Sequence, residues 1–166
     1  ENTKQCQIII TLGGVSKGNY DLIRKHYRKL GIKILVDGIP IKPGKPLIIG
    51  KLDSKIIFCL PGNPISSIVC SKLFIVALIK KMLGEKLDKI ITRKALLSED
   101  IEIPISQREH YMRAFTYQEA ATQYVKPFSQ QDSSLHSVLI KSNCLLIIPP
   151  GSSSNFKDQI VDIIDF

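Results

Sequence analysis

The sequence predicts an α/β fold, in which an incomplete three-layer domain is followed by a smaller, mostly β domain. Residues 7–30 read as a buried strand followed by a helix with one apolar face. Beyond residue 84 the chain changes to short apolar runs separated by turn residues. We therefore predict one domain at residues 1–86 and a second at residues 87–166, a usual size for small domains.

The first half of the chain alternates strands with helices. Residues 7–12 form an apolar run typical of a strand buried on both faces of a parallel sheet. Apolar residues at positions 20, 23, 27 and 30 predict a helix with a single apolar stripe, and Gly31 is suited to end it in the left-handed conformation. Residues 32–36 then read as a second strand.

The apolar runs 47–50 and 56–60 are separated by a short polar segment, which predicts a hairpin. Pro64 suits the first turn of a helix, where its missing N–H does no harm, and the apolar stretch continues to Leu83. Gly84 is placed to end this helix.

The second half contains strand-like runs and one short helical pattern. The predicted strands are residues 90–97, 111–117, 124–127, 144–148 and 159–164, and the predicted short helix is residues 134–141. Tyr111, Arg113 and Phe115 alternate in a way that would suit base stacking but is more typical of a strand with one solvated face.

The net charge of +8 and the pI near 9.4 fit an anionic partner. The lysines are scattered and no nucleic-acid motif is present, so a nucleic-acid partner is not favoured. Residues 65–83, the most apolar segment, contain three lysines and suit a packed helix better than a membrane span.

The four cysteines and three histidines lie far apart, without metal-ligand spacing. Reduced thiols and a cytoplasmic location are the simplest interpretation. The chain begins at Glu1 with no signal peptide before the first strand, so we expect a processed piece or a fragment of a longer protein.

Three loops carry the candidate chemistry. In the first, Gly13 and Gly14 end a strand and let a ligand approach main-chain donors, and Ser16 adds a hydroxyl. A tight turn without a ligand explains the glycines equally well. Asp21 stands near the start of the following helix, where the dipole favours a carboxylate, and its functional interpretation is a ligand of Mg²⁺.

The second loop holds two ammonium groups, Lys42 and Lys45, among prolines that restrict the backbone, and the functional interpretation is favoured there. The third comprises Pro61, Gly62, Asn63 and Pro64, where an amide and main-chain donors at a helix start could face an anion. A plain strand-to-helix break remains open for it.

The common nucleotide-binding fingerprints and local signatures of a hydrolase triad are absent from the sequence. The three loops together therefore predict positioning and electrostatic stabilisation of an anionic ligand.

The residues of these loops, in order and spacing, resemble the molybdopterin molybdenumtransferase family, which includes bacterial MoeA-type proteins and the gephyrin E domain. The matching runs are residues 11–16 with Gly18 and Asp21, residues 42–46 and residues 60–64. The resemblance continues through Arg93, residues 108–113, residues 131–133, Asn143 and residues 150–151. It implies a partial MogA-like molybdopterin-binding domain followed by the family's small β domain.

The resemblance implies an enzyme that inserts molybdate into adenylylated molybdopterin, with Mg²⁺, and releases AMP. Asp21 and Lys42 would be the catalytic residues, Asp21 as a metal ligand and Lys42 as a contact of molybdate. The remaining substrate-binding residues would be Gly13, Gly14, Ser16, Lys45, Pro61, Gly62, Asn63 and Ser133. The family also implies a homodimer.

The sequence departs from the family in three respects. Gly38 stands where a basic residue is usual, and Asp132 replaces a glycine before Ser133. The amino-terminal domains and a Thr-Gly-Asp-Glu loop are absent, so we predict reduced or no catalysis by residues 1–166 alone. The alternatives are a MogA-type molybdopterin adenylyltransferase, which the second domain and Asn63 disfavour, a non-catalytic scaffold as in the gephyrin branch, or a decayed fragment.

Overall fold

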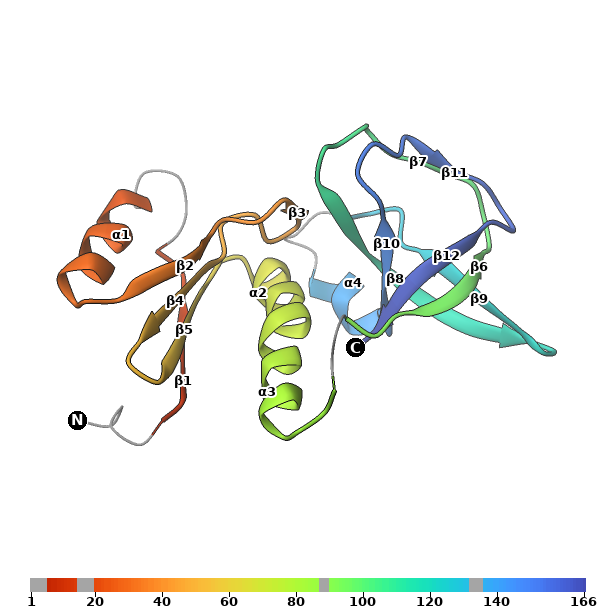
Figure 1. Ribbon diagram of the computed structural model, residues 1–166. Coiled ribbons are helices and arrows are strands. Elements are labelled where there is room, and N and C mark those ends of the chain that lie inside the picture. Colours follow the sequence, from red (N-terminus) through yellow and green to blue (C-terminus); the bar gives the residue numbers. More distant parts are fainter. Residues whose placement is uncertain (1–5, 15–19, 87–89, 132–135) are drawn as a thin grey trace. The chain divides into compact units, whose positions relative to one another are not determined.

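The computed structural model describes residues 6–14, 20–86, 90–131 and 136–166, with only the backbone at 20–22 and 136 (Figure 1). The chain divides into two compact units. The first contains residues 1–39 and 44–78, and the second contains residues 40–43 and 79–166. Each unit has its own sheet and is described separately.

The first unit is built on a four-stranded sheet with the order β1-β5-β4-β2. Its strands and helices are β1 (Ile8–Leu12), α1 (Tyr20–Lys29), β2 (Lys33–Asp37), β4 (Ile48–Leu52), β5 (Lys55–Leu60), α2 (Pro64–Cys70), the π-helical turn η1 (Ser71–Ile75) and α3 (Val76–Met82), whose last residues belong to the second unit. Strands β1 and β5 are parallel, and β5, β4 and β2 are antiparallel neighbours.

Helices cover both faces of this sheet (Figure 1). On one face, Tyr27 of α1 packs with Ile48, Ile57 and Cys59 of the sheet. The alternating side chains of β5 point to the other face, where Phe58 is buried and α2 packs against the strand. The unit is therefore three-layered, as the sequence predicts.

Two helix ends follow the sequence prediction. Gly31 has a φ of 74° and its N–H donates to the carbonyl of Arg28, which closes α1. Gly84 has a φ of 91° and closes α3 in the same way, through Lys81. Between Pro64 and Met82 the helix is continuous but contains the π turn, which the sequence did not predict.

The second unit is a barrel. Its elements are β3 (Ile41–Lys42), β6 (Arg93–Leu97), β7 (Ile101–Glu102), β8 (Glu109–Glu119), β9 (Thr122–Pro127), α4 (His136–Lys141), β10 (Cys144–Ile148), β11 (Ser154–Asn155) and β12 (Ile160–Asp165). The main sheet has the order β10-β12-β6-β9-β8-β3, and β10 also pairs with β8, which closes the ring. Strands β7 and β11 form a separate ribbon.

The barrel core is made of apolar side chains at alternate positions of the strands, such as positions 144, 146 and 148 of β10. Met112 and Ala114 of β8, Leu146 of β10 and Ile163 of β12 share this core. The opposite side chains of β8 point out of the barrel, toward the side on which α4 packs. The second unit is therefore mostly β, as predicted.

Strand β3 was not predicted. Residues 40–43 leave the first unit's sheet, and Ile41 and Lys42 pair in parallel with Glu109 and His110 of β8. The N–H of Glu109 donates to the carbonyl of Pro40 at 3.0 Å. The loop that carries Lys42 and Lys45, called the lysine loop below, thus supplies a strand to the sheet of the second unit.

The barrel core provides a direct stability test. Leu146 is 0% exposed and Leu83 is 78% exposed. We predict that Leu146→Ala lowers the free energy of unfolding by about 2–5 kcal/mol because it leaves a cavity. Leu83→Ala, a matched control, changes it by less than about 0.5 kcal/mol. Urea unfolding measures both, and equal losses would contradict this description of the core.

Candidate functional site

The two glycine turns of the first unit lie against each other at the carboxyl ends of β1 and β5. The N–H of Gly13 donates to the carbonyl of Leu60 at 3.0 Å. A Cβ built on Gly62 would lie 3.4 Å from the Cα of Gly13, so the backbones nearly touch. Gly13 and Gly14 have φ of 83° and 75°, which other residues rarely adopt. The structure therefore brings both predicted turns to one sheet edge.

Asn63 has a defined structural role at this edge. Its side-chain oxygen accepts a hydrogen bond from the N–H of Ser66 at 3.2 Å and caps α2. The Ser67 hydroxyl donates to the carbonyls of Pro61 and Asn63. These bonds fix the Pro-Gly-Asn-Pro turn through contacts within the chain.

Helix α2 also supports the lysine loop. The thiol of Cys70, which is 0% exposed, donates to the carbonyl of Gly44 at 3.6 Å. The carbonyl of Lys45 accepts from Ile39 at 2.9 Å. The backbone of this part of the loop is therefore fixed within the first unit, as its prolines predicted.

In the second unit, pairing of β3 with β8 places Lys42 opposite His110. The pKa of His110 is lowered from 6.5 to about 4, first by burial and then by the positive charges of Lys42, Arg108 and Arg113. His110 is therefore neutral at pH 7. We call these four residues the cationic cluster.

Arg113 is the most buried member of the cationic cluster, with only 2% of its surface exposed. Its backbone is held by the side chain of Gln131. The Gln131 oxygen accepts from the N–H of Arg113 at 3.0 Å, and its nitrogen donates to the Arg113 carbonyl at 2.9 Å. The side-chain amide thus pairs with β8 as a neighbouring strand would.

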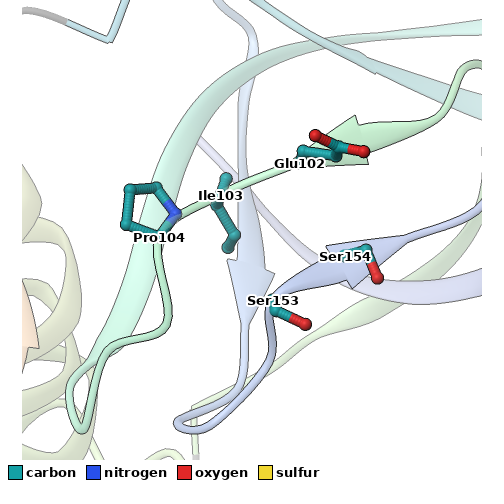
Figure 2. Close-up of a pocket in the computed structure, with 5 residues that line it drawn as sticks. All are labelled: Glu102, Ile103, Pro104, Ser153 and Ser154. Carbon is teal, nitrogen blue, oxygen red and sulfur yellow. The ribbon is translucent and has the colours of Figure 1, made fainter.

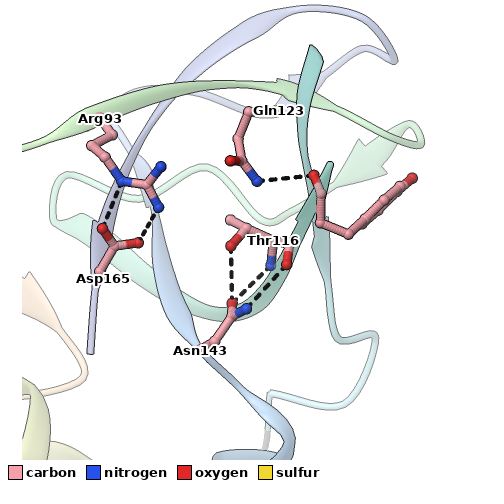
Figure 3. A network of polar contacts seen from close by, with 6 residues as sticks. Arg93, Thr116, Gln123, Asn143 and Asp165 are labelled. Atoms are coloured by element: carbon pink, nitrogen blue, oxygen red, sulfur yellow. Dashed lines mark hydrogen bonds and ion pairs between the residues drawn. The ribbon is translucent and has the colours of Figure 1, made fainter. Parts of the chain in front are cut away.

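Asn143 does the same farther along β8 (Figure 3). Its side-chain oxygen accepts from the N–H of Thr116 at 2.8 Å, and its nitrogen donates to the Thr116 carbonyl at 3.0 Å. Beside it, Arg93 forms a two-pronged ion pair with Asp165, with one N–O distance of 2.6 Å. Arg93 and Asn143, noted only in the resemblance, are structural residues here.

The predicted site residues have different outcomes. Gly13, Gly14, Pro61, Gly62 and Asn63 meet at one edge of the first unit, and Lys42 joins the cationic cluster of the second. Ser16, Ser133 and the side chain of Asp21 lie outside the described residues.

Sequence reasoning missed the cationic cluster. The alternation around Arg113 predicted a solvated face, and this was wrong for Tyr111 and Arg113, which are 5% and 2% exposed. Only Phe115, at 45%, is exposed as expected. Arg108 precedes β8, and His110 and Arg113 are three residues apart along it, so no strand periodicity in the sequence marks the cluster.

A pocket of about 550 Å³ lies beside the β7–β11 ribbon, at residues 102–104 and 153–154. Figure 2 shows Glu102 on one segment and the hydroxyls of Ser153 and Ser154 on the other. The charged group that lines it is a carboxylate. The carboxylate of Glu102 would repel an anionic ligand. This pocket therefore differs from the cationic cluster in the charge of the ligand that it favours.

Neither a metal-binding group of side chains nor a membrane-spanning helix is found in the described part of the chain. It contains no group of three or more His, Cys, Asp or Glu side chains placed to hold a metal ion. None of its helices has both the length and the apolar character needed to cross a membrane.

Comparison with known families accounts for nearly the whole chain. Residues 1–81 match a family described as a probable molybdopterin binding domain, and residues 95–166 match the MoeA carboxyl-terminal region, domain IV. The succession of both, in this order, decides the family. The chain belongs to the molybdopterin molybdenumtransferase family. It corresponds to the carboxyl-terminal part of a MoeA protein.

Curated relatives of this family include the molybdopterin molybdenumtransferases of Haemophilus influenzae and Bacillus subtilis. The first is 33% identical over 98% of this chain and 40% of its own length. The second is 26% identical over 99% of this chain and 38% of its own length. The chain thus spans about 40% of the length of such relatives.

Solved structures with the same fold as this chain come from molybdenum cofactor biosynthesis proteins. A molybdopterin biosynthesis MoeA protein of Pyrococcus horikoshii superposes with a TM-score of 0.75 and 25% identity over 97% of this chain and 37% of its own. A molybdenum cofactor biosynthesis protein of Pyrococcus furiosus superposes with a TM-score of 0.65 at 20% identity, over 98% of this chain and 69% of its own. The α/β and mostly β units therefore have the MoeA fold.

The cationic cluster makes stability depend on pH. In the unfolded chain His110 takes up a proton near pH 6.5, whereas in the folded chain it does so only near pH 4. The unfolded state binds more protons between these values, so stability falls as the pH is lowered through this window. Because His110 is partly exposed, we predict a loss of about 1–2 kcal/mol.

The measurement is urea unfolding at pH 6.5 and pH 4, with His110→Gln and, as a control without a titrating group, the exposed Leu83→Ala. The difference in stability between the two pH values should shrink in the His110 variant and stay unchanged in the Leu83 variant. An unchanged difference in His110→Gln would show that this residue is not held neutral.

Proposed function

We propose that this chain acts in molybdenum cofactor biosynthesis as the carboxyl-terminal part of a molybdopterin molybdenumtransferase. The reaction is insertion of molybdate into adenylylated molybdopterin with release of AMP. The observation that carries the proposal is the cationic cluster, in which Lys42, Arg108 and Arg113 act together on a neutral His110.

The cationic cluster has the electrostatic properties of an oxyanion site. Lysine and arginine side chains keep their charge at pH 7, and arginine offers a planar fork of donors to oxygen atoms. Their combined positive potential disfavours protonation of His110. The same potential stabilises a bound dianion, and molybdate is a dianion at pH 7. We therefore assign Lys42 a role in binding molybdate.

We assign the phosphate-bearing part of the substrate to the first unit, with Gly13, Gly14, Ser16, Lys45, Pro61, Gly62 and Asn63. The Gly13 N–H and the Asn63 side-chain oxygen already have partners within the chain. The contribution of the glycines is therefore the close backbone approach that a Cβ would block. Lys45 contributes an ammonium group on a fixed backbone.

Three parts of the proposal come from the family alone. They are Asp21 as a ligand of Mg²⁺ and a catalytic residue, Ser133 as a substrate contact, and a cytoplasmic homodimer. The described residues supply no metal-binding group, so we derive no step through Mg²⁺.

The activity requires further protein. Strand β1 is at the edge of its sheet, and its Ile10 and Leu12 are 50% and 71% exposed. An exposed apolar edge strand favours pairing with another segment. We propose that the amino-terminal part of a MoeA protein, in the same or another chain, covers this edge.

Two other functions are less well supported. A MogA-type adenylyltransferase would not require the barrel, whereas residues 95–166 match the MoeA carboxyl-terminal region. A scaffold without catalysis, or a decayed fragment, would bind neither molybdate nor adenylylated molybdopterin. Position 38 is a glycine, where the family usually has a basic residue. The experiment below therefore also has to distinguish the enzyme from a scaffold and from a decayed fragment.

The test is molybdate-dependent release of AMP from adenylylated molybdopterin. We expect little or no release by residues 1–166 alone and measurable release after addition of the amino-terminal part of a related MoeA protein. The complemented Lys42→Ala variant should be at least about tenfold less active, since it loses a charge-assisted contact. Lys157→Ala, an exposed lysine of the same unit, is the control.

Loss of release in both variants, or in neither, would contradict the assignment of Lys42. No release by the complemented wild-type chain, with folding verified, would contradict the proposed reaction.

A further inference from the structure

We propose that a second pocket of the barrel unit binds a small planar aromatic anion. The pocket has a volume of about 310 Å³ and is lined by Phe115, Lys126, Pro127, Phe128 and Lys141. None of these residues belongs to the cationic cluster, and the family comparison assigns none of them a role.

The fold aims the pocket residues outward. Ala114 lies in the barrel core, so its neighbour Phe115 must point out of the barrel. Lys126 of β9 is the cross-strand partner of Phe115 and faces the same way. Lys141, the last residue of α4, joins them from the helix that packs against β8.

The wall of the pocket continues as a row of stacked rings. Phe115 and Tyr117 have centroids 6.5 Å apart and planes 16° apart. Tyr117 and Tyr124 follow at 5.7 Å and 19°. Phe115, the end of this row at the pocket, is 45% exposed. Offset stacking with a further ring is the favourable way to cover such a face.

The charged groups select an anion. Lys126 makes an ion pair with Glu99 at 3.2 Å, and the two side chains are 60% and 42% exposed. An ion pair this exposed contributes little, so the ammonium group can turn to a ligand. Lys141 supplies a second ammonium group at the pocket. With Glu99 included, the three groups carry a net charge of +1.

The size and the walls limit the ligand. A volume near 310 Å³ is at the lower end of small-molecule pockets. It suits one or two fused rings with a single carboxylate or phosphate. The rings would lie on Phe115 and Phe128, and the anion would face the lysines, which are also able to interact with the ring face.

The test is a titration of the 166-residue chain with 2-naphthoate, followed by amide chemical shifts of β8, β9 and α4. Two further probes separate the contributions of ring and charge. The uncharged 2-naphthamide and the non-aromatic cyclohexanecarboxylate should each bind at least about fivefold more weakly than 2-naphthoate.

Two variants locate the site. Phe115→Ala and Lys141→Gln should each weaken 2-naphthoate binding at least about fivefold, whereas the exposed controls Phe156→Ala and Lys157→Gln should not change it. Shifts confined to other elements, equal binding of all three probes, or unchanged affinity in Phe115→Ala with a preserved spectrum would overturn the proposal. The outcome is independent of molybdate insertion, because no pocket residue takes part in that proposed reaction.

Discussion

The backbone of strand β8 is the constraint on which the second unit depends. Over eleven residues it pairs with β10, β9 and β3, and every main-chain donor and acceptor that is buried needs a partner. Where a neighbouring strand ends, a side-chain amide takes its place. Gln131 pairs with Arg113 beyond Pro127, the last residue of β9, and Asn143 pairs with Thr116 just before β10 begins.

This pairing explains how like charges are brought together. Lys42, Arg108 and Arg113 repel one another, and no favourable contact among them would assemble the cationic cluster. The backbone ladder of β3 on β8 fixes Lys42, and the Gln131 amide fixes the strand at Arg113. The strand pairing holds these groups near His110, whose pKa their positive charges help to lower.

Local patterns in the sequence were sufficient for most of the fold. The stripe of α1, its end at Gly31 and the hairpin of β4 and β5 depend on contacts within a few residues, and all were predicted. Strand β3 has two residues, too few for any periodicity, and its partner is far along the chain. The π turn at η1 likewise has no local signal in the sequence.

The candidate site was predicted only in part. Glycine and proline mark the turns of the first unit, because such turns need their backbone angles. The cationic cluster depends instead on the pairing of β3 with β8, which joins distant parts of the chain. The alternation of Tyr111, Arg113 and Phe115 predicted a solvated face, but Arg113 is buried, so the expected solvent exposure was wrong. Burial of this kind is decided by tertiary contacts that a strand pattern does not contain.

The most direct measurement is the pKa of the His110 imidazole, followed by NMR in the absence and presence of molybdate. The central claim is that burial, and then the positive charges of Lys42, Arg108 and Arg113, lower this pKa to about 4 and that a bound oxyanion offsets those charges. The account predicts that molybdate raises the pKa of His110, and that sodium chloride at equal ionic strength raises it much less. A pKa near the ordinary 6.5 without molybdate, or no change when molybdate is added, would contradict it.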